Sequence, residues 1–408
     1  PKLAAHCMHM FVGEDIPFET FRTLVQKSYS QFRTPEIAPV KAAGPFHILE
    51  LFHGPTLAFK DIALQFLGNV FEHIITQRGE QLNLLGATSG DTGSAAIYGV
   101  RGRRNINIFI MYPRGRVSPI QEHQMTTVPD ANVFNIAVEG TFDDTQEILK
   151  DVFQDAVFKK TNALGAVNSV NWARILAQIV YYFHAAFRTQ EATGAHRVNV
   201  CVPTGNFGNI LAGYIARRMG APISQLLLAT NENDILARFF NAGIYSKTAV
   251  QQTISPSMDI QVASNFERYL YYRMSEDPEN VRSLMKQFSK QGCITLDGQD
   301  PVFRAGTADS VQAMHVIDTF YRDYGYLLDP HTATGVHVAG QFNPTDAPVI
   351  CLATAHPSKF PEAIRRATGK DIARHPVLEG ILEKTARSKV LPADTASIKA
   401  YISDCLHD

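Results

Sequence analysis

The chain has 408 residues, of which 45% are hydrophobic and 19% are charged, and its formal net charge is −1. This composition excludes a largely disordered protein, and the balance of charges gives no reason to expect a nucleic acid or a membrane surface as partner. We therefore expect two or three packed units and a small-molecule partner.

The cysteines indicate a reducing compartment. The five of them lie far apart, include no C-x-x-C pair and are odd in number, which argues against a disulfide framework and a structural zinc site. The apolar runs are far shorter than the ~20 residues of a membrane span, and the first residues show no signal-peptide pattern. The sequence therefore predicts a cytoplasmic protein.

Strand-like apolar runs alternate with helical patterns along most of the chain. We predict strands over residues 82–87, 106–112, 133–138, 198–202, 226–229 and 349–353. We predict four helices among these strands. The first begins near Ser94, and the second ends with the helical stretch through Gln121. The third runs from a cap at Thr141 or Asp143 to Phe153, and the fourth spans 210–219. This alternation is typical of a mostly parallel sheet with helices on both faces, so the predicted fold class is α/β.

Two segments depart from this pattern. Residues 275–308 are polar and rich in Gly, Asp and Gln, which predicts an insertion or a surface excursion. The segment after Gly369 carries mixed charges and is predicted to pack as helices on the outside.

Lys60 stands at the start of a helical pattern. Apolar residues recur at helical spacing from Phe59 to Ile74, which predicts an amphipathic helix with Lys60 in its first turn. The helix macrodipole and burial both favour the neutral amine, which is the form that attacks a carbonyl group. The alternative is a lysine that extends to solvent with Asp61 as a loose partner.

Three segments could bind anions. The turn 205–209 follows a predicted strand and opens a helix, so its backbone N–H groups could bind a phosphate. The turn 89–93 adds hydroxyl groups to a similar geometry, although Asp91 opposes an anion unless it faces another group. In the segment 168–174, Arg174 could bind a phosphate through two hydrogen bonds. Each segment also has a structural explanation, namely a tight turn that requires glycine or a capped helix with a surface arginine.

Motifs for other chemistries are absent from the sequence. No G-x-G-x-x-G follows a strand, and neither G-x-x-x-x-G-K-[ST] nor H-E-x-x-H occurs. A Rossmann dinucleotide site, a Walker-type NTPase and a catalytic metal are therefore disfavoured, and isolated His53, His331 and His356 are more often structural. One amine together with three anion-binding segments suits a phosphate-bearing aldehyde cofactor and an amino-acid substrate.

Six segments resemble the threonine synthase family and follow the same order. They are LFHGPTLAFKD (51–61), GATSGDTGSAA (86–96), YPRGRVSPIQ (112–121), NSVNWARILAQIVYYFHAA (168–186), VPTGNFGNILAGY (202–214) and ATAHPSKFPEA (353–363). The resemblance runs from about residue 11 to the C-terminus, and it is most like the proteobacterial and fungal branch of the family.

The resemblance implies a pyridoxal 5'-phosphate enzyme of the tryptophan-synthase-like fold, with two mostly parallel three-layer α/β domains. It implies a remainder of the N-terminal region at 1–44, a large cofactor-binding domain at 45–82 and 163–408, and a smaller substrate-side domain at 83–162. The implied reaction converts O-phosphohomoserine and water to L-threonine and phosphate, in a cytoplasmic monomer or homodimer without a metal.

The resemblance also assigns roles to single residues. It implies that Lys60 forms the Schiff base with the cofactor and moves protons at the α and β carbons of the substrate. The implied cofactor site consists of the phosphate loop Gly205, Asn206, Phe207, Gly208 and Asn209, of Thr354 at the pyridine nitrogen, and of Asp91, which replaces the Asn of another branch. The implied substrate site consists of Ser89, Thr92, Asn168, Ser169 and Arg174.

Two alternatives stay open beside the synthase. One is a related phospho-lyase that releases 2-oxobutyrate, ammonia and phosphate, and the other is a non-catalytic protein on the same fold. The intact FHGPTLAFKD and GNFGN motifs favour the synthase over the lyase, and Lys60 argues against a non-catalytic protein.

Overall fold

The computed structural model describes residues 1–297, 299–342 and 347–407. The chain divides into two compact units. Unit 1 consists of Pro1–Phe18, Thr34–His53 and Trp172–Arg374, and unit 2 consists of Glu19–Arg33, Gly54–Asn171 and His375–Asp408. These bounds differ from those of the predicted domains, because residues 54–82 and the C-terminal segment fall in unit 2. The functional role predicted for each domain stays a prediction.

Unit 1 is built on a six-stranded sheet with the order β1-β2-β12-β7-β8-β11. Its strands are β1 (Val40–Ala43), β2 (Phe46–Glu50), β7 (Val198–Pro203), β8 (Ile223–Thr230), β11 (Phe303–Thr307) and β12 (Val349–Ala353). Among these strands β1 and β2 pair antiparallel, and the other neighbours pair parallel.

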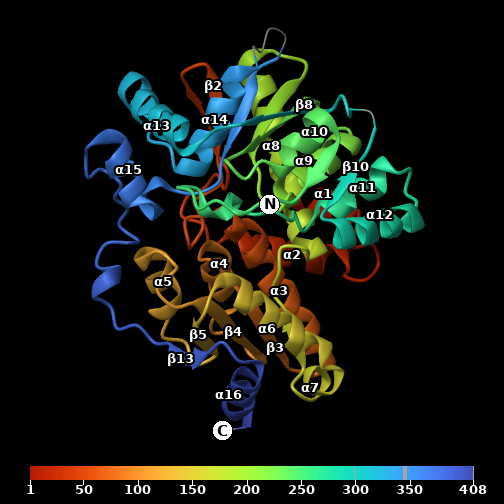
Figure 1. Ribbon diagram of the computed structural model, residues 1–408, viewed down its shortest axis with the longest axis vertical. Helices are drawn as coiled ribbons and strands as arrows, with labels where there is room; N and C mark the ends of the chain where they lie inside the picture. The colour runs from red at the N-terminus through yellow and green to blue at the C-terminus, as the bar shows by residue number, and fades with distance from the viewer. Residues whose placement is uncertain (298, 343–346, 408) are drawn as a thin grey trace. The chain divides into compact units, whose positions relative to one another are not determined.

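Helices cover both faces of the unit 1 sheet (Figure 1). The helices are α8 (Trp172–Thr193), α9 (Gly208–Arg218) and α10 (Ile235–Ala242) on one face, and α13 (Ser310–Tyr324) and α14 (Pro330–Gln341) on the other. The chain crosses from β7 to β8 in one direction and returns from β11 to β12 in the other. Because parallel crossovers are right-handed, the two directions place their helices on opposite faces.

Unit 2 is built on a five-stranded sheet with the order β13-β5-β4-β3-β6, in which all described pairs are parallel. Its strands are β3 (Leu82–Ala87), β4 (Ile106–Pro113), β5 (Val133–Glu139), β6 (Leu164–Ala166) and β13 (Lys389–Pro392). Its helices are α3 (Lys60–Arg78), α4 (Asp91–Val100), α5 (Pro119–Thr126), α6 (Phe142–Gln154), α7 (Ala156–Thr161) and α16 (Thr395–His407). Both units therefore confirm the α/β fold class.

The remaining elements are shorter or lie between these. They are α1 (Lys2–His9), α2 (Phe18–Tyr29), β9 (Ile244–Ser246), α11 (Phe266–Arg273), α12 (Pro278–Gln291), β10 (Cys293–Thr295), α15 (Pro361–Thr368) and the 3₁₀ helices η1 (Pro256–Met258), η2 (Pro357–Lys359) and η3 (Ile381–Glu383). In the part of the chain that the structure describes, no helix is both long and apolar enough to cross a membrane.

The predicted strands are all present, and the helix boundaries were less accurate. Thr141 caps α6 and forms a capping box with Asp144, which decides between the two predicted caps. Helix α4 begins at Asp91 and not near Ser94, because Gly90 takes a conformation with φ 139° and turns the chain directly into the helix.

The predictions for two polar segments were wrong in part. Residues 275–308 contain α12 and also β11, which pairs with β8 as the edge strand of the unit 1 sheet. The C-terminal segment contains the predicted helix, α16, but also β13, which extends the unit 2 sheet beside β5. Both strands were missed because neither sequence, FRAGT in β11 or KVLP in β13, contains the longer apolar run by which the other strands were predicted.

Helices α3 and α4 approach each other through two glycines. A Cβ atom on Gly68 would overlap the carbonyl oxygen of Gly99, and one on Gly99 would lie 2.5 Å from the carbonyl oxygen of Leu64. The two backbones are thus in direct contact, which fixes the position of α3 and of Lys60 at its first residue.

We expect Gly68→Ala to destabilise the protein by about 1–3 kcal/mol, because the added methyl group forces two helix backbones apart. The measurement is the midpoint of thermal unfolding. Gly340→Ala in α14 is the control, since nothing lies within 4 Å of its added Cβ atom, and it should be neutral or slightly stabilising. Equal midpoints for the two variants would contradict the proposed backbone contact.

Candidate active site

Lys60 occupies the first residue of α3 in unit 2, as predicted, and its side chain is only 12% exposed. Its Nζ lies 3.9 Å from Oδ2 of Asp91. Oδ1 of Asp91 accepts a 2.8 Å hydrogen bond from Nε2 of Gln121. The carboxylate of Asp91 therefore faces the amine of Lys60 and the amide of Gln121. Its negative charge favours the ammonium form of Lys60, whereas the macrodipole of α3 favours the neutral amine.

Asp61 shapes the loop that leads into Lys60. Its two carboxylate oxygens accept hydrogen bonds from the backbone N–H of Thr56, at 2.8 Å, and from the hydroxyl of Thr56, at 2.7 Å. A side chain on Gly54 would collide with Asp61. The alternative, in which Lys60 extends to solvent with Asp61 as a loose partner, does not fit these positions, because Asp61 is fully buried and hydrogen-bonded to its own loop.

The backbone hydrogen bonds of the turn 89–93 differ from those expected for an anion-binding turn. The backbone N–H groups of Gly90 and Gly93 donate to the hydroxyl of Thr88, at 3.0 and 2.9 Å. Two donors of the turn are thus used internally. Ser89 is exposed, Thr92 is half-buried in the first turn of α4, and no side chain caps this helix.

The loop 205–209 joins β7 to α9 in unit 1, as predicted. Phe207 has φ 63°, a left-handed conformation that is uncommon for a residue with a Cβ atom. Its ring is 1% exposed and packs against Phe240, Phe266 and Tyr269 at centroid distances of 5.7–5.8 Å. Left-handed backbone costs roughly 1–2 kcal/mol, and several aromatic pairs at ~0.5–1.5 kcal/mol each offset that cost.

Asn209 has an unused buried donor. Its Oδ1 lies within hydrogen-bond distance of the hydroxyls of Tyr181 and Tyr182 in α8, but its Nδ2 has no hydrogen-bond partner in the described part of the chain. No side chain caps α9, so its first N–H groups are also available. A buried donor beside an uncapped helix fits a phosphate-bearing cofactor.

The 3₁₀ helix η1 packs against the loop 205–209 at Gly205. A Cβ atom on Gly205 would lie 2.5 Å from the carbonyl oxygen of Ser257 in η1. The backbone N–H of Ser257 donates to Nε2 of His331, at 3.3 Å, and Nδ1 of His331 lies 2.9 Å from Asp329. His331 was predicted to be structural, and it contacts η1, the start of its own helix and the ring of Phe360 before α15, at a centroid distance of 5.1 Å.

A buried carboxylate anchors the segment that carries η1. Asp259 accepts hydrogen bonds from Asn231 at 2.7 Å and from the hydroxyl and N–H of Thr253 at 2.7 and 3.0 Å. Burial raises the pKa of Asp259, although these hydrogen bonds oppose the shift. No sequence pattern predicted this network, because its residues come from separate polar segments.

Thr354 and Arg174 are buried at the ends of unit 1 elements. Thr354 directly follows β12, is 6% exposed, and its hydroxyl makes no hydrogen bond within the described residues. Arg174 lies in the first turn of α8, and burial lowers the pKa of its guanidinium to about 10, so it stays cationic at neutral pH. The alternative of a surface arginine was therefore wrong.

Asn168 and Ser169 precede α8 and do not share its helical turns. Oδ1 of Asn168 accepts a 3.2 Å hydrogen bond from the N–H of Val170, which forms a turn before the helix begins. The predicted site residues are thus divided by unit. Unit 2 holds Lys60, Ser89, Asp91, Thr92, Asn168 and Ser169, and unit 1 holds Arg174, the loop 205–209 and Thr354.

The sequence prediction missed Gln121 as a member of the Lys60 and Asp91 group. Gln121 is the last residue of the motif YPRGRVSPIQ, so the motif itself could have pointed to it. Among the described residues, no group of three or more His, Cys, Asp or Glu side chains is placed to hold a metal ion.

Comparison with known proteins gives consistent results. Residues 39–354 match the family of pyridoxal-phosphate dependent enzymes, and residues 332–402 match the C-terminal region of threonine synthase. The threonine synthase of Pseudomonas aeruginosa is 46% identical over 411 residues, which cover 98% of this chain and 87% of that protein.

Solved structures agree with the sequence matches. The pyridoxal-phosphate-bound threonine synthase of Brucella melitensis has a TM-score of 0.94 and 42% identity, with 100% of this chain and 89% of that chain covered. The yeast threonine synthase has a TM-score of 0.93 and 40% identity, with 99% and 88% covered.

We expect Gly205→Ala to weaken the binding of pyridoxal 5'-phosphate by about tenfold or more, because its Cβ atom would push the loop away from Ser257. Cofactor affinity is measured by absorbance titration of the apoprotein. Gly340→Ala, also in unit 1, should bind the cofactor normally. Unchanged affinity in Gly205→Ala would show that the contact with η1 does not shape the loop.

Proposed function

Because the chain belongs to the pyridoxal-phosphate-dependent threonine synthase family, we propose that it converts O-phosphohomoserine and water to L-threonine and phosphate, with Lys60 as the residue that bonds to the cofactor. The observation that carries this assignment is the buried first-turn position of Lys60, 3.9 Å from Asp91. We also propose that the enzyme acts in the cytoplasm as a monomer or homodimer.

Pyridoxal 5'-phosphate, when bound, takes up the electron pair that proton removal leaves on a substrate carbon. The proton itself is held by the protein. The amine of Lys60 accepts the proton from the α carbon, and the carboxylate of Asp91 stabilises the resulting ammonium group. The hydrogen bond from Gln121 keeps Asp91 oriented while the charge on Lys60 changes.

The loop 205–209 and Thr354 are assigned to the cofactor. The N–H groups at the start of α9 and the free Nδ2 donor of Asn209 bind the cofactor phosphate. The hydroxyl of Thr354 would donate a hydrogen bond to the pyridine nitrogen of the bound cofactor, so a neutral group of this chain would hold that end of the ring.

The substrate is assigned to five residues at or before the starts of α4 and α8. Ser89 and Thr92, at the start of α4, bind the substrate carboxylate. Asn168 and Ser169, in the turn before α8, and the guanidinium of Arg174 bind the substrate phosphate. An anion at Arg174 offsets the desolvation that lowers its pKa.

The decisive experiment is a product assay. Purified protein loaded with pyridoxal 5'-phosphate is given O-phosphohomoserine, and threonine, 2-oxobutyrate and phosphate are quantified together. We expect threonine and phosphate in equal amounts, and a loss of at least about a hundredfold in Lys60→Ala, because a proton-transferring group is removed.

Each of the other possible outcomes would assign a different function to the protein. Phosphate with 2-oxobutyrate in place of threonine would identify the phospho-lyase, in which water addition does not occur. Bound cofactor without phosphate release would indicate a non-catalytic member of the fold. The thermal unfolding midpoint of Lys60→Ala serves as the control for folding.

We expect Thr354→Val to weaken cofactor binding by about twofold to tenfold, since one hydrogen bond is lost at constant volume. Thr354→Ser keeps the hydroxyl and should bind almost normally. The matched control is Thr334→Val, because the hydroxyl of Thr334 bonds to the carbonyl of Pro330 in its own helix. If Thr354→Val and Thr334→Val behave alike, Thr354 does not contact the cofactor.

A further inference from the structure

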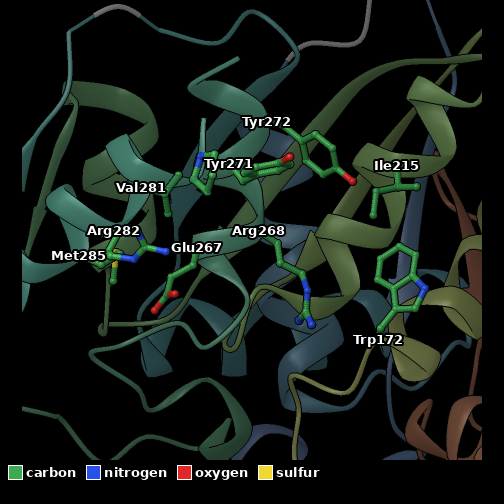
Figure 2. A pocket seen from close by; sticks show the side chains of 10 residues that line it. Trp172, Ile215, Glu267, Arg268, Tyr271, Tyr272, Val281, Arg282 and Met285 are labelled. Atoms are coloured by element: carbon green, nitrogen blue, oxygen red, sulfur yellow. The ribbon is translucent and has the colours of Figure 1, made fainter. Parts of the chain in front are cut away.

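A cavity of about 650 Å³ lies in unit 1 outside the groups assigned above. It is formed by α11, by α12, by Trp172 at the start of α8 and by Ile215 in the last turn of α9. Figure 2 shows the residues that line it, which include Trp172, Glu267, Arg268, Tyr271, Tyr272 and Arg282. The guanidinium of Arg268 lies on the Trp172 side of the cavity, whereas Glu267 and Arg282 lie on the opposite side.

Arg268 and Arg282 differ in their partners. Arg282 is paired with Glu279 one turn away, and its side chain is 67% exposed. Arg268 donates a 2.7 Å hydrogen bond to Oδ1 of Asn265, and within the described residues no carboxylate lies within 4 Å of its guanidinium. Burial lowers the pKa of Arg268 but leaves it cationic. The direct hydrogen-bond acceptor of Arg268 is therefore a neutral amide, and the carboxylate of Glu267 acts on its charge only from a longer distance.

Aromatic side chains form the wall next to Arg268. Trp172 packs against Phe11 at a centroid distance of 5.5 Å, and Tyr272 stacks with the guanidinium of Arg218 at 4.3 Å. Both rings are thus held by neighbours from other elements. An apolar wall lowers the local dielectric, which strengthens the attraction of a guanidinium for an anion.

Asn265 links Arg268 to the loop 205–209. Its backbone N–H and its Nδ2 both donate to the carbonyl oxygen of Asn206, each at 3.1 Å. Its Nδ2 also lies 3.2 Å from the place where a Cβ atom of Gly208 would stand. An anion that draws Arg268 away from Asn265 therefore changes the hydrogen bonding of a residue that supports the cofactor loop.

We propose that the Arg268 end of this cavity binds inorganic phosphate and couples its binding to the loop 205–209 through Asn265. The proposal rests on the proposed function for the source of the ligand, since phosphate is the product of that reaction. Phosphate forms charge-assisted hydrogen bonds with a guanidinium, and the cavity has room for its hydration shell. By linkage, phosphate at Arg268 and cofactor at the loop must alter each other's affinity by the same factor.

Trp172 is the one tryptophan of the sequence and lines the cavity, so its fluorescence reports on the site directly. The full chain loaded with pyridoxal 5'-phosphate is titrated with inorganic phosphate at constant ionic strength, with chloride as the reference salt. We expect a saturable fluorescence change. Arg268→Gln should weaken its midpoint at least about tenfold, because a charge-assisted hydrogen bond is lost.

Arg282→Gln is the matched control, since it removes an arginine from the same cavity and should leave the midpoint within about twofold. An unchanged midpoint in Arg268→Gln would overturn the proposal. So would a variant that loses cofactor absorbance while phosphate still binds normally, because Arg268 would then only support the loop. Failure of the proposed function appears separately, as absence of threonine in the product assay while the fluorescence response persists.

Discussion

The burial of the Phe207 ring is the interaction on which the conformation of the loop 205–209 depends. The ring lies among Phe240, Phe266 and Tyr269, and it holds its own backbone in a left-handed conformation. That conformation turns the chain from β7 directly into α9, so the first N–H groups of the helix stay free of side-chain caps. The aromatic core of unit 1 thus decides the backbone geometry of the loop 205–209.

Support for this loop comes from several directions and is mostly polar. On one side η1 limits the space beside Gly205, and on another Asn265 binds the carbonyl of Asn206. Asp259 holds the segment that carries η1 through hydrogen bonds that are all buried or half-buried. Such networks are stable when every group is satisfied, and Nδ2 of Asn209 is an exception because it has no hydrogen-bond partner among the described residues.

The electrostatics around Lys60 illustrate a balance of opposing effects. Its position at a helix start and its burial favour a neutral amine, whereas the carboxylate of Asp91 favours the charged form. A base that must accept and return a proton benefits when such opposing effects act on it. Gln121 completes the arrangement by fixing the carboxylate through a neutral hydrogen bond.

Local patterns in the sequence predict much of this organisation. Apolar runs and their spacing predicted the α/β class, six of the strands, the helix that begins at Lys60 and the turn 205–209, because these features depend on residues that are neighbours in the sequence. The motifs then identified the family and its cofactor. The tertiary structure alone decided that Asp61 bonds to its own loop, that Arg174 is buried, that β11 and β13 are edge strands, and that Asn265 joins Arg268 to the cofactor loop. Each of these depends on which residues distant in sequence meet in space, and a single sequence carries no direct record of those contacts.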